Sequence, residues 1–288
     1  SRSWGAVRIL IQFYISATGC LCQAFVTVVS EARLTIATVI IDAGLLIATI
    51  VSKAGESVIS RLDPRVLLLV VGGVQIFFHG GYWKSLGKRD FSFVAPPFAT
   101  AGAIAAVIDY ALVPGVDMDE LVRQCRAAVA WLHRHVGEFG GDPDRLFVSG
   151  HSAGGHIVGM LAATDWPADF GVPADVVKGG LSLSGLFDLE PIQLSFVNAE
   201  LGLTPDSARR NSPALLPVSP HVPLTLAYGG LESDEYHRQS TLFAEHLERL
   251  GGSPALKPIA DRHHFDIVVD LADAGSEVFR LAAAQMGL

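Results

Sequence analysis

The sequence predicts an α/β fold in which helices flank a mostly parallel central sheet. From residue 66 onward, short β-rich runs alternate with amphipathic stretches of helical period, the pattern of βαβ units. The 288 residues are enough to bury the core of one large domain. Half of the residues are hydrophobic and 17% are charged, which excludes a disordered chain.

Six short apolar runs are predicted to be the strands of this sheet. Gly, Pro or Asp bounds each run, and these residues favour turns at the ends of strands. In chain order the predicted strands are 74–78, 103–109, 146–149, 180–184, 224–228 and 255–259.

The stretches between and after these strands are predicted to be helices. Residues 119–138 place apolar side chains on one stripe at three-to-four spacing, with charges opposite. Residues 155–163 form a second helical run, and 233–250 a third, with Ser233 as its N-cap and a Gly-Gly pair as its end. The last predicted helix is 272–286.

Residues 1–60 are atypical, because they hold an apolar run from Leu34 to Val51 that only Asp42 interrupts. A membrane span, a buried helix and buried strands are all compatible with such a run. The β-branched residues and the central Asp favour burial in the protein. We therefore assign 1–60 to the same domain as 61–288, as a cap, and expect no membrane association.

Charge and cysteine content restrict the partners and the compartment. The formal net charge is −8, and no run of Lys and Arg is suited to a phosphate backbone, so nucleic acid is excluded as a partner. Cys20, Cys22 and Cys125 are an odd number, and the first two are too close for an ordinary disulfide. No secretory signal is evident at the start. These features indicate a cytoplasmic protein, and they leave a homodimer open.

The segment Gly150-His151-Ser152-Ala153-Gly154 carries the strongest chemical signal. It follows a predicted strand and precedes a helix, where a nucleophilic serine needs small neighbours because the turn is sharp. The helix N-terminus also faces developing negative charge. An ordinary serine in a tight turn is the alternative interpretation of this pattern taken alone.

An upstream segment, His79-Gly80-Gly81-Tyr82-Trp83, is predicted to complete an oxyanion hole. Its glycines let peptide N–H groups turn inward. We assign the hole to the N–H groups of Gly81, Tyr82 and Ala153, and His79 to a structural role.

The candidate base and acid follow the last two predicted strands. His263 and His264 compete for the base, and we choose His264 because Phe265 beside it is expected to anchor the loop in the core. Glu232 and Asp234 compete for the acid, and Glu232 is favoured because it precedes the helix. The order serine, acid, histidine agrees with a hydrolase triad.

Together these motifs resemble the kynurenine formamidase (arylformamidase)-like branch of the α/β-hydrolase superfamily, which also includes bacterial carboxylesterases. The resemblance covers residues 62–288. The segments that carry it are His79–Trp83, Gly141–Arg145, Gly150–His156, Ser184–Pro191, Arg210–Pro213, Glu232–Ser240 and His264–Phe265. It implies an α/β-hydrolase fold, and neither a cofactor nor a metal.

The pocket and its substrate are less constrained by sequence. The loop-like stretch 185–222 is interpreted as a lid, since it joins two strands on the side of the active-site loops. We assign the pocket wall to Tyr82, Trp83, His151, Phe187 and Asn198.

The apolar N-terminal segment, together with Tyr82, Trp83 and Phe187, favours a carboxylesterase acting on small to medium acyl esters. Hydrolysis of N-formylkynurenine, an arylformamidase reaction, is the alternative, because esters and aryl formamides need the same catalytic groups. A non-catalytic binding module on a hydrolase scaffold is a more remote alternative.

Overall fold

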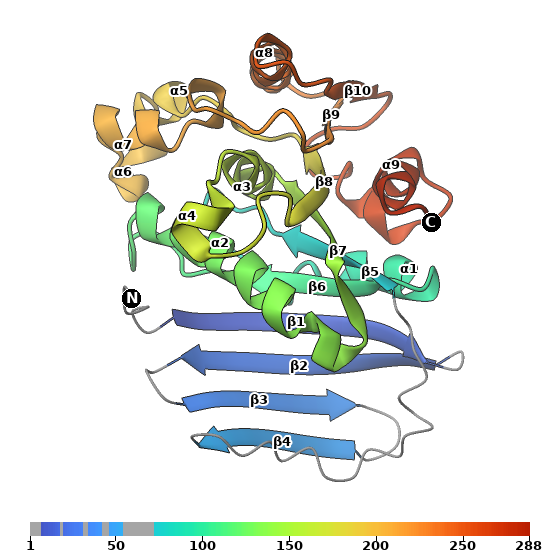
Figure 1. Ribbon diagram of the computed structural model, residues 1–288. Helices are drawn as coiled ribbons and strands as arrows, with labels where there is room; N and C mark the ends of the chain where they lie inside the picture. The colour runs from blue at the N-terminus through green and yellow to red at the C-terminus, as the bar shows by residue number, and fades with distance from the viewer. Residues whose placement is uncertain (1–6, 18–19, 31–33, 42–45, 54–71) are drawn as a thin grey trace.

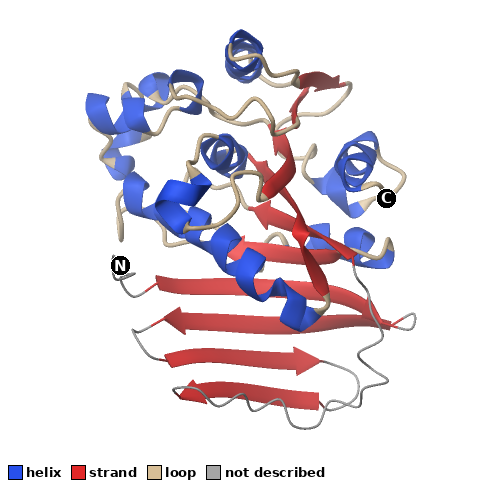
Figure 2. Cartoon of the chain, viewed as in Figure 1, coloured by secondary structure: helices blue, strands red, loops and turns tan. Residues whose placement is uncertain are grey.

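The chain is described from a computed structural model, which covers residues 7–17, 20–30, 34–41, 46–53 and 72–288. In these residues the strands form an eight-stranded central sheet and a separate two-stranded sheet. Figure 1 shows the central sheet running through the molecule, and Figure 2 shows helices on both of its sides.

Six neighbouring strands of the central sheet are parallel. The order along the sheet is β10-β9-β8-β7-β5-β6-β1-β2, and every pairing from β10 to β6 is parallel. The parallel strands are β5 (Gly72–Phe78), β6 (Ile104–Asp109), β7 (Gly141–His151), β8 (Val177–Leu183), β9 (Leu224–Gly229) and β10 (Ala255–Ile259). All six strands that the sequence predicts are confirmed.

Each face of the parallel sheet buries its own layer of helices. On one face pack α2 (Met118–His135), α3 (Ala153–Ala162) and α8 (Asp234–Arg249), and on the other α1 (Ala95–Thr100) and α9 (Glu277–Met286). Side chains of a strand alternate between these faces. In β5, Ile76 and Phe78 join the first core and Phe77 joins the second.

Two predicted helices begin or end elsewhere than expected. After α2 the chain continues as a 3₁₀ turn, Val136–Phe139, which stops at Gly140 in the left-handed region with φ 80°. The last helix begins at Glu277 and not at 272, because the Ser276 side chain accepts a hydrogen bond from the backbone N–H of Phe279 and caps it there.

The N-terminal residues that the structure describes are strands. β1 (Val7–Ala17) and β2 (Cys20–Ser30) extend the central sheet beyond β6 in antiparallel pairing. β3 (Leu34–Ile41) and β4 (Leu46–Lys53) pair with each other. The long apolar run therefore contains two strands, while Asp42 lies outside the described residues. None of the described helices has the length and apolar character of a membrane-spanning segment. The role of residues 1–60 as a cap stays a prediction.

The stretch 185–222 holds more helix than its loop-like composition indicates. Between β8 and β9 lie three short α-helices, α5 (Glu190–Gln193), α6 (Asn198–Leu201) and α7 (Pro205–Arg210), and the 3₁₀ turn Pro213–Leu215. A capping box at Thr204 starts α7. Arg210 at its end forms an ion pair with Asp119 of α2 at 2.6 Å, so this stretch is attached to the helical layer.

Candidate active site

Ser152 occupies a sharp turn between β7 and α3. Its backbone has φ 56° and ψ −116°, a strained conformation for a residue with a side chain. A Cβ on Gly150 would lie 2.2 Å from the carbonyl oxygen of Gly154, and a Cβ on Gly154 would lie 1.9 Å from that of Phe78. Close approach of the backbones therefore requires both glycines of the motif.

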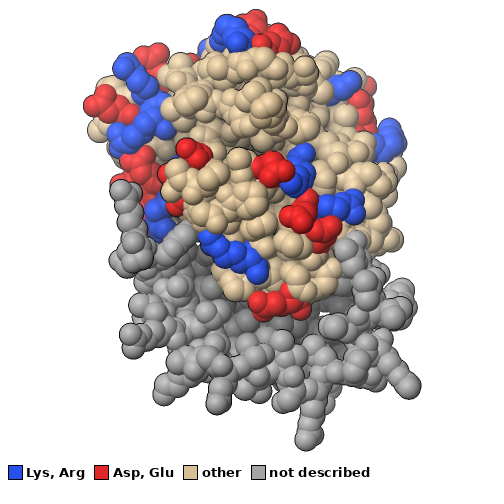
Figure 3. All heavy atoms as spheres, viewed as in Figure 1, with Lys and Arg blue, Asp and Glu red and all other residues tan. Residues whose placement is uncertain are grey.

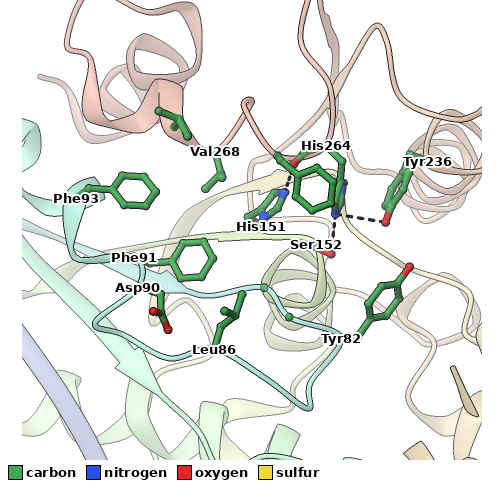
Figure 4. A pocket seen from close by; sticks show the side chains of 14 residues that line it. Tyr82, Leu86, Asp90, Phe91, Phe93, His151, Ser152, Tyr236, His264 and Val268 are labelled. Atoms are coloured by element: carbon green, nitrogen blue, oxygen red, sulfur yellow. Dashed lines mark hydrogen bonds between the residues drawn. The ribbon is translucent and has the colours of Figure 1, made fainter. Parts of the chain in front are cut away.

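His264 connects Ser152 to a carboxylate. Its Nε2 lies 3.1 Å from Ser152 Oγ, and its Nδ1 lies 2.6 Å from Oε1 of Glu232. With the carboxylate as acceptor, Nδ1 carries the ring proton, so Nε2 is available to accept the proton of the serine hydroxyl. Figure 4 shows His264 directly over Ser152. Loops after three parallel strands thus meet in one hydrogen-bonded chain.

The side chain of Glu232 is 0% exposed and held in place. Its Oε2 accepts hydrogen bonds from Ser184 Oγ and from the backbone N–H of Gly229, each at 2.8 Å. Asp234, the competing acid, lies exposed in the first turn of α8. The structure therefore brings Glu232, and not Asp234, to His264.

The loop after β10 is held by its backbone. The Nε2–H of His151 donates to the carbonyl oxygen of His264 at 2.7 Å. The sequence-based expectation that Phe265 anchors this loop in the core is wrong, because its side chain is 77% exposed. Ile267 is buried instead, and the competing His263 is exposed. The hydrogen bond from His151 and the burial of Ile267 thus hold the loop that carries the imidazole.

The turn after β5 presents backbone N–H groups beside the serine. Gly81 and Tyr82 have φ 111° and 48°, and a Cβ on Gly81 would lie 2.2 Å from the carbonyl oxygen of Ser85. In the described part of the chain, the N–H groups of Gly81, Tyr82 and Ala153 have no acceptor. Unpaired donors next to a nucleophile are what an oxyanion hole requires.

Three histidines near the serine are buried. Burial lowers the pKa of His151 to about 3 and the pKa of His156 to about 4. Burial also lowers the pKa of His79, whose ring stacks on Tyr110 with centroids 4.2 Å apart. The Nδ1–H of His79 donates to the carbonyl oxygen of Gly80 at 2.7 Å. These neutral, buried rings therefore stabilise the turns around Ser152.

A cavity of about 490 Å³ opens over Ser152. Figure 4 shows Tyr82 and Tyr236 on one side of the serine and apolar side chains such as Phe91 on the other. The apolar wall consists of Leu86, Phe91, Phe93, Phe265, Val268 and Val269. An aromatic or aliphatic group therefore fits beside the serine without polar partners.

Three residues that the sequence assigned to the pocket lie elsewhere. Trp83 is fully buried in the core, where its Nε1–H donates to Nδ1 of His156 at 3.1 Å. Phe187 is 0% exposed in the same core. The amide of Asn198 bonds to the backbone of Leu203 and closes a local turn. Tyr82 and His151 do line the cavity, because the turn after β5 sends Tyr82 outward and Trp83 inward.

The sequence patterns did not point to Tyr236, which the structure places against the candidate base. Its Oη lies 3.3 Å from Nε2 of His264, and the two rings stack with centroids 4.3 Å apart. Tyr236 follows Glu232 by four residues, about one helical turn. The signal in the sequence that could have identified it is a tyrosine about one helical turn after the candidate acid.

Charge is sparse in the site. Among the described residues that line the cavity, Asp90 alone carries a charged side chain, and its Oδ2 accepts a hydrogen bond from the backbone N–H of Gly87 at 2.9 Å.

No residue of 185–222 belongs to this lining, so the lid role stays a prediction. The described residues include no group of three or more His, Cys, Asp or Glu arranged to hold a metal ion. On the face seen in Figure 3, acidic and basic side chains are interspersed.

Comparison with protein families agrees with this arrangement. A family model described as "alpha/beta hydrolase fold" matches residues 75–208. The solved structure of a hyperthermophilic esterase from the archaeon Pyrobaculum calidifontis superposes with a TM-score of 0.65 at 16% sequence identity, covering 96% of this chain and 85% of that one. At this identity the likeness concerns the fold.

Several curated proteins are similar in sequence, and two of them represent the activities found among them. A kynurenine formamidase of Danio rerio is 33% identical over 217 residues, which are 74% of this chain and 72% of that protein. Carboxylesterase NlhH of Mycobacterium tuberculosis is 37% identical over 90 residues, 31% of this chain and 28% of that protein. The first similarity extends over most of both chains.

Proposed function

The chain belongs to the α/β-hydrolase family, and we propose that it hydrolyses aryl formamides such as N-formylkynurenine through an acyl-enzyme on Ser152. The hydrogen-bonded chain from Ser152 through His264 to Glu232 supports acyl transfer. The 33% identity to a kynurenine formamidase over 74% of this chain supports a formamide as the acyl compound.

In the proposed reaction, Ser152 Oγ bonds to the formyl carbon as its proton passes to Nε2 of His264. The negative oxygen that results is stabilised by the N–H groups of Gly81, Tyr82 and Ala153. The C–N bond breaks when Nε2–H gives this proton to the nitrogen, and the arylamine leaves.

A water molecule then attacks the formyl ester, and its proton passes to Nε2 of His264. Formic acid leaves as Ser152 Oγ regains a proton from Nε2, and it ionises to formate in solution. Throughout, the Glu232 carboxylate keeps the imidazole in the Nδ1–H tautomer and stabilises its positive charge.

The shape of the cavity is compatible with such a substrate. A formyl group is the smallest acyl group, and it needs little space between Ser152 and the tyrosines. The aryl part of the leaving group matches the apolar wall that includes Phe91 and Val268. Asp90, the charged side chain of the described lining, is suited to an ammonium group on the substrate.

A carboxylesterase is the second candidate, and the sequence patterns alone had placed it first. The apolar wall favours it, because that wall accepts acyl or alkoxy groups without specific polar contacts. The similarity to a carboxylesterase over 31% of this chain favours it as well. We rank the formamide ahead of the ester because the similarity to a kynurenine formamidase extends over 74% of this chain.

The test compares kcat/KM of the wild-type protein for N-formylkynurenine and for a short-chain p-nitrophenyl ester, with Ser152→Ala as the blank. We expect the formamide to be the better substrate, and the variant to lose about 10⁴-fold or more with either. An advantage of several orders of magnitude for the ester would favour the second candidate. No turnover of either substrate and no labelling of Ser152 by a fluorophosphonate would leave a binding module.

A further inference from the structure

The hydroxyl of Tyr236 lies beside Nε2 of His264, the candidate general acid and base. Its Oη is 3.3 Å from this Nε2, the atom that delivers a proton to the leaving group. Ser152 Oγ is 3.1 Å from the same Nε2. In the described lining of the cavity, the side chains of these two residues alone have a polar atom in hydrogen-bond range of Nε2.

Local packing holds the phenol in this position. The ring of Tyr236 stacks on the imidazole of His264 at an interplanar angle of 29°. The residue belongs to the first turn of α8, which begins two residues after Glu232. The chain thus passes directly from the candidate acid into the helix that carries Tyr236, so this hydroxyl and the candidate triad are positioned by adjoining segments.

The phenol stays neutral in this environment. Burial, together with the neighbouring hydroxyl of Tyr82, raises the pKa of Tyr236 above its ordinary value. A neutral phenol donates one hydrogen bond and still accepts through its oxygen lone pairs. Figure 4 shows the hydroxyls of Tyr82 and Tyr236 on the same side of the serine, and a side-chain hydrogen bond with Tyr82 contributes to the raised pKa of Tyr236, so Tyr82 is the acceptor for the O–H of Tyr236.

An amide and an ester differ at this point of the reaction. When the C–N bond of a secondary amide breaks, the nitrogen becomes tetrahedral and its lone pair turns to the proton on Nε2. Its own N–H then points into the space beside Nε2 and needs an acceptor. An ester oxygen carries no hydrogen there, so it gains nothing from an acceptor.

We propose that Tyr236 Oη accepts the N–H of the scissile amide in the transition state and thereby selects secondary aryl formamides over esters and N-alkylated formamides. The inference rests on the proposed formamidase function and adds its substrate class, which is formamides with a free N–H. A contact formed only in the transition state raises kcat more than it lowers KM.

The test uses three substrates with one aryl group: formanilide, N-methylformanilide, which lacks the N–H, and phenyl formate, in which oxygen replaces the nitrogen. Tyr236→Phe removes the hydroxyl and keeps the ring. We expect kcat/KM for formanilide to fall about 10- to 100-fold, mainly in kcat, as for one lost transition-state hydrogen bond. Phenyl formate and N-methylformanilide should lose less than about 3-fold.

A matched control is Tyr228→Phe, because Tyr228 lies at the end of β9, contacts His237 and does not line the described cavity. It should leave all three rates within about 2-fold of wild type. An equal loss on all three substrates with Tyr236→Phe would overturn the inference, since it would indicate a role in holding His264. An unchanged rate on formanilide would overturn it as well.

The wild-type protein alone provides a second measurement, which does not depend on how a variant folds. Its kcat/KM should be at least about 10-fold higher for formanilide than for N-methylformanilide. If the wild type cleaves formanilide without this preference, the inference fails and the formamidase proposal stands. If it cleaves phenyl formate and no formamide, the proposed function fails, and the inference fails with it.

Discussion

At the scale of single residues, two carboxylates two positions apart have different environments. Glu232 is buried, accepts hydrogen bonds from Ser184 and Gly229, and contacts His264. Asp234 is exposed at the start of α8. A carboxylate that orients a histidine has to be held in place, so the surroundings of Glu232, more than its chemical type, suit it to the role.

Paired substitutions test this assignment. We expect Glu232→Gln to lower kcat about 10³- to 10⁴-fold, because an amide at this position favours the wrong tautomer of His264. Asp234→Asn should change kcat less than about 3-fold, since Asp234 contributes a solvated charge to a helix N-terminus. Steady-state rates on one substrate are the measurement. A larger loss from Asp234→Asn would contradict the choice of Glu232.

At the scale of elements, the site is a product of the parallel sheet. Parallel strands end at the same edge, so the loops after β7, β9 and β10 meet there. The turn between β7 and α3 is possible because two glycines let it pass close to other backbone segments. Only small residues fit two positions before and two positions after Ser152, where β7 meets α3.

Two glycine substitutions separate close approach from flexibility. Gly154→Ala should destabilise the protein by about 3 kcal/mol or more and lower activity, because its Cβ would lie 1.9 Å from a carbonyl oxygen of β5. Gly137→Ala should be neutral or stabilising by up to about 1 kcal/mol, since nothing lies within 4 Å of that Cβ. Urea denaturation gives both values. Similar stability of the two variants would contradict the argument.

At the scale of the whole molecule, the two buried layers include titratable groups that stay neutral. His151 and His156 are the clearest cases, with pKa values lowered by burial to about 3 and about 4. In the unfolded chain a histidine binds a proton below about pH 6.5. The unfolded state therefore binds more protons than the native state between these values, and acid favours unfolding.

A pH series of unfolding measurements tests this linkage. We expect the free energy of unfolding to fall as the pH drops from 6.5 to about 4, by up to about 1.4 kcal/mol per pH unit for each of the two histidines. His156→Gln should destabilise the protein at pH 7 and reduce that slope by up to the contribution of one group. A slope equal to that of wild type would show that His156 is not the group responsible.

The sequence by itself determined the α/β class, all six parallel strands and the candidate nucleophile Ser152, and it narrowed the acid to Glu232 or Asp234 and the base to His263 or His264. These features depend on periodicity, turn residues and chain order, which are local properties of the sequence. The glycines around Ser152 belong to this group, because only small residues pass through such a turn.

The tertiary structure alone decided which side chains face the cavity. Trp83, Phe187 and Asn198 turn into the core or a local turn, while Phe265 and Tyr236 line the cavity. The direction of a side chain in a loop depends on which distant segments pack against that loop, and spacing along the chain does not carry this information. For the same reason the apolar run after residue 34 had several interpretations until its strand pairing was seen.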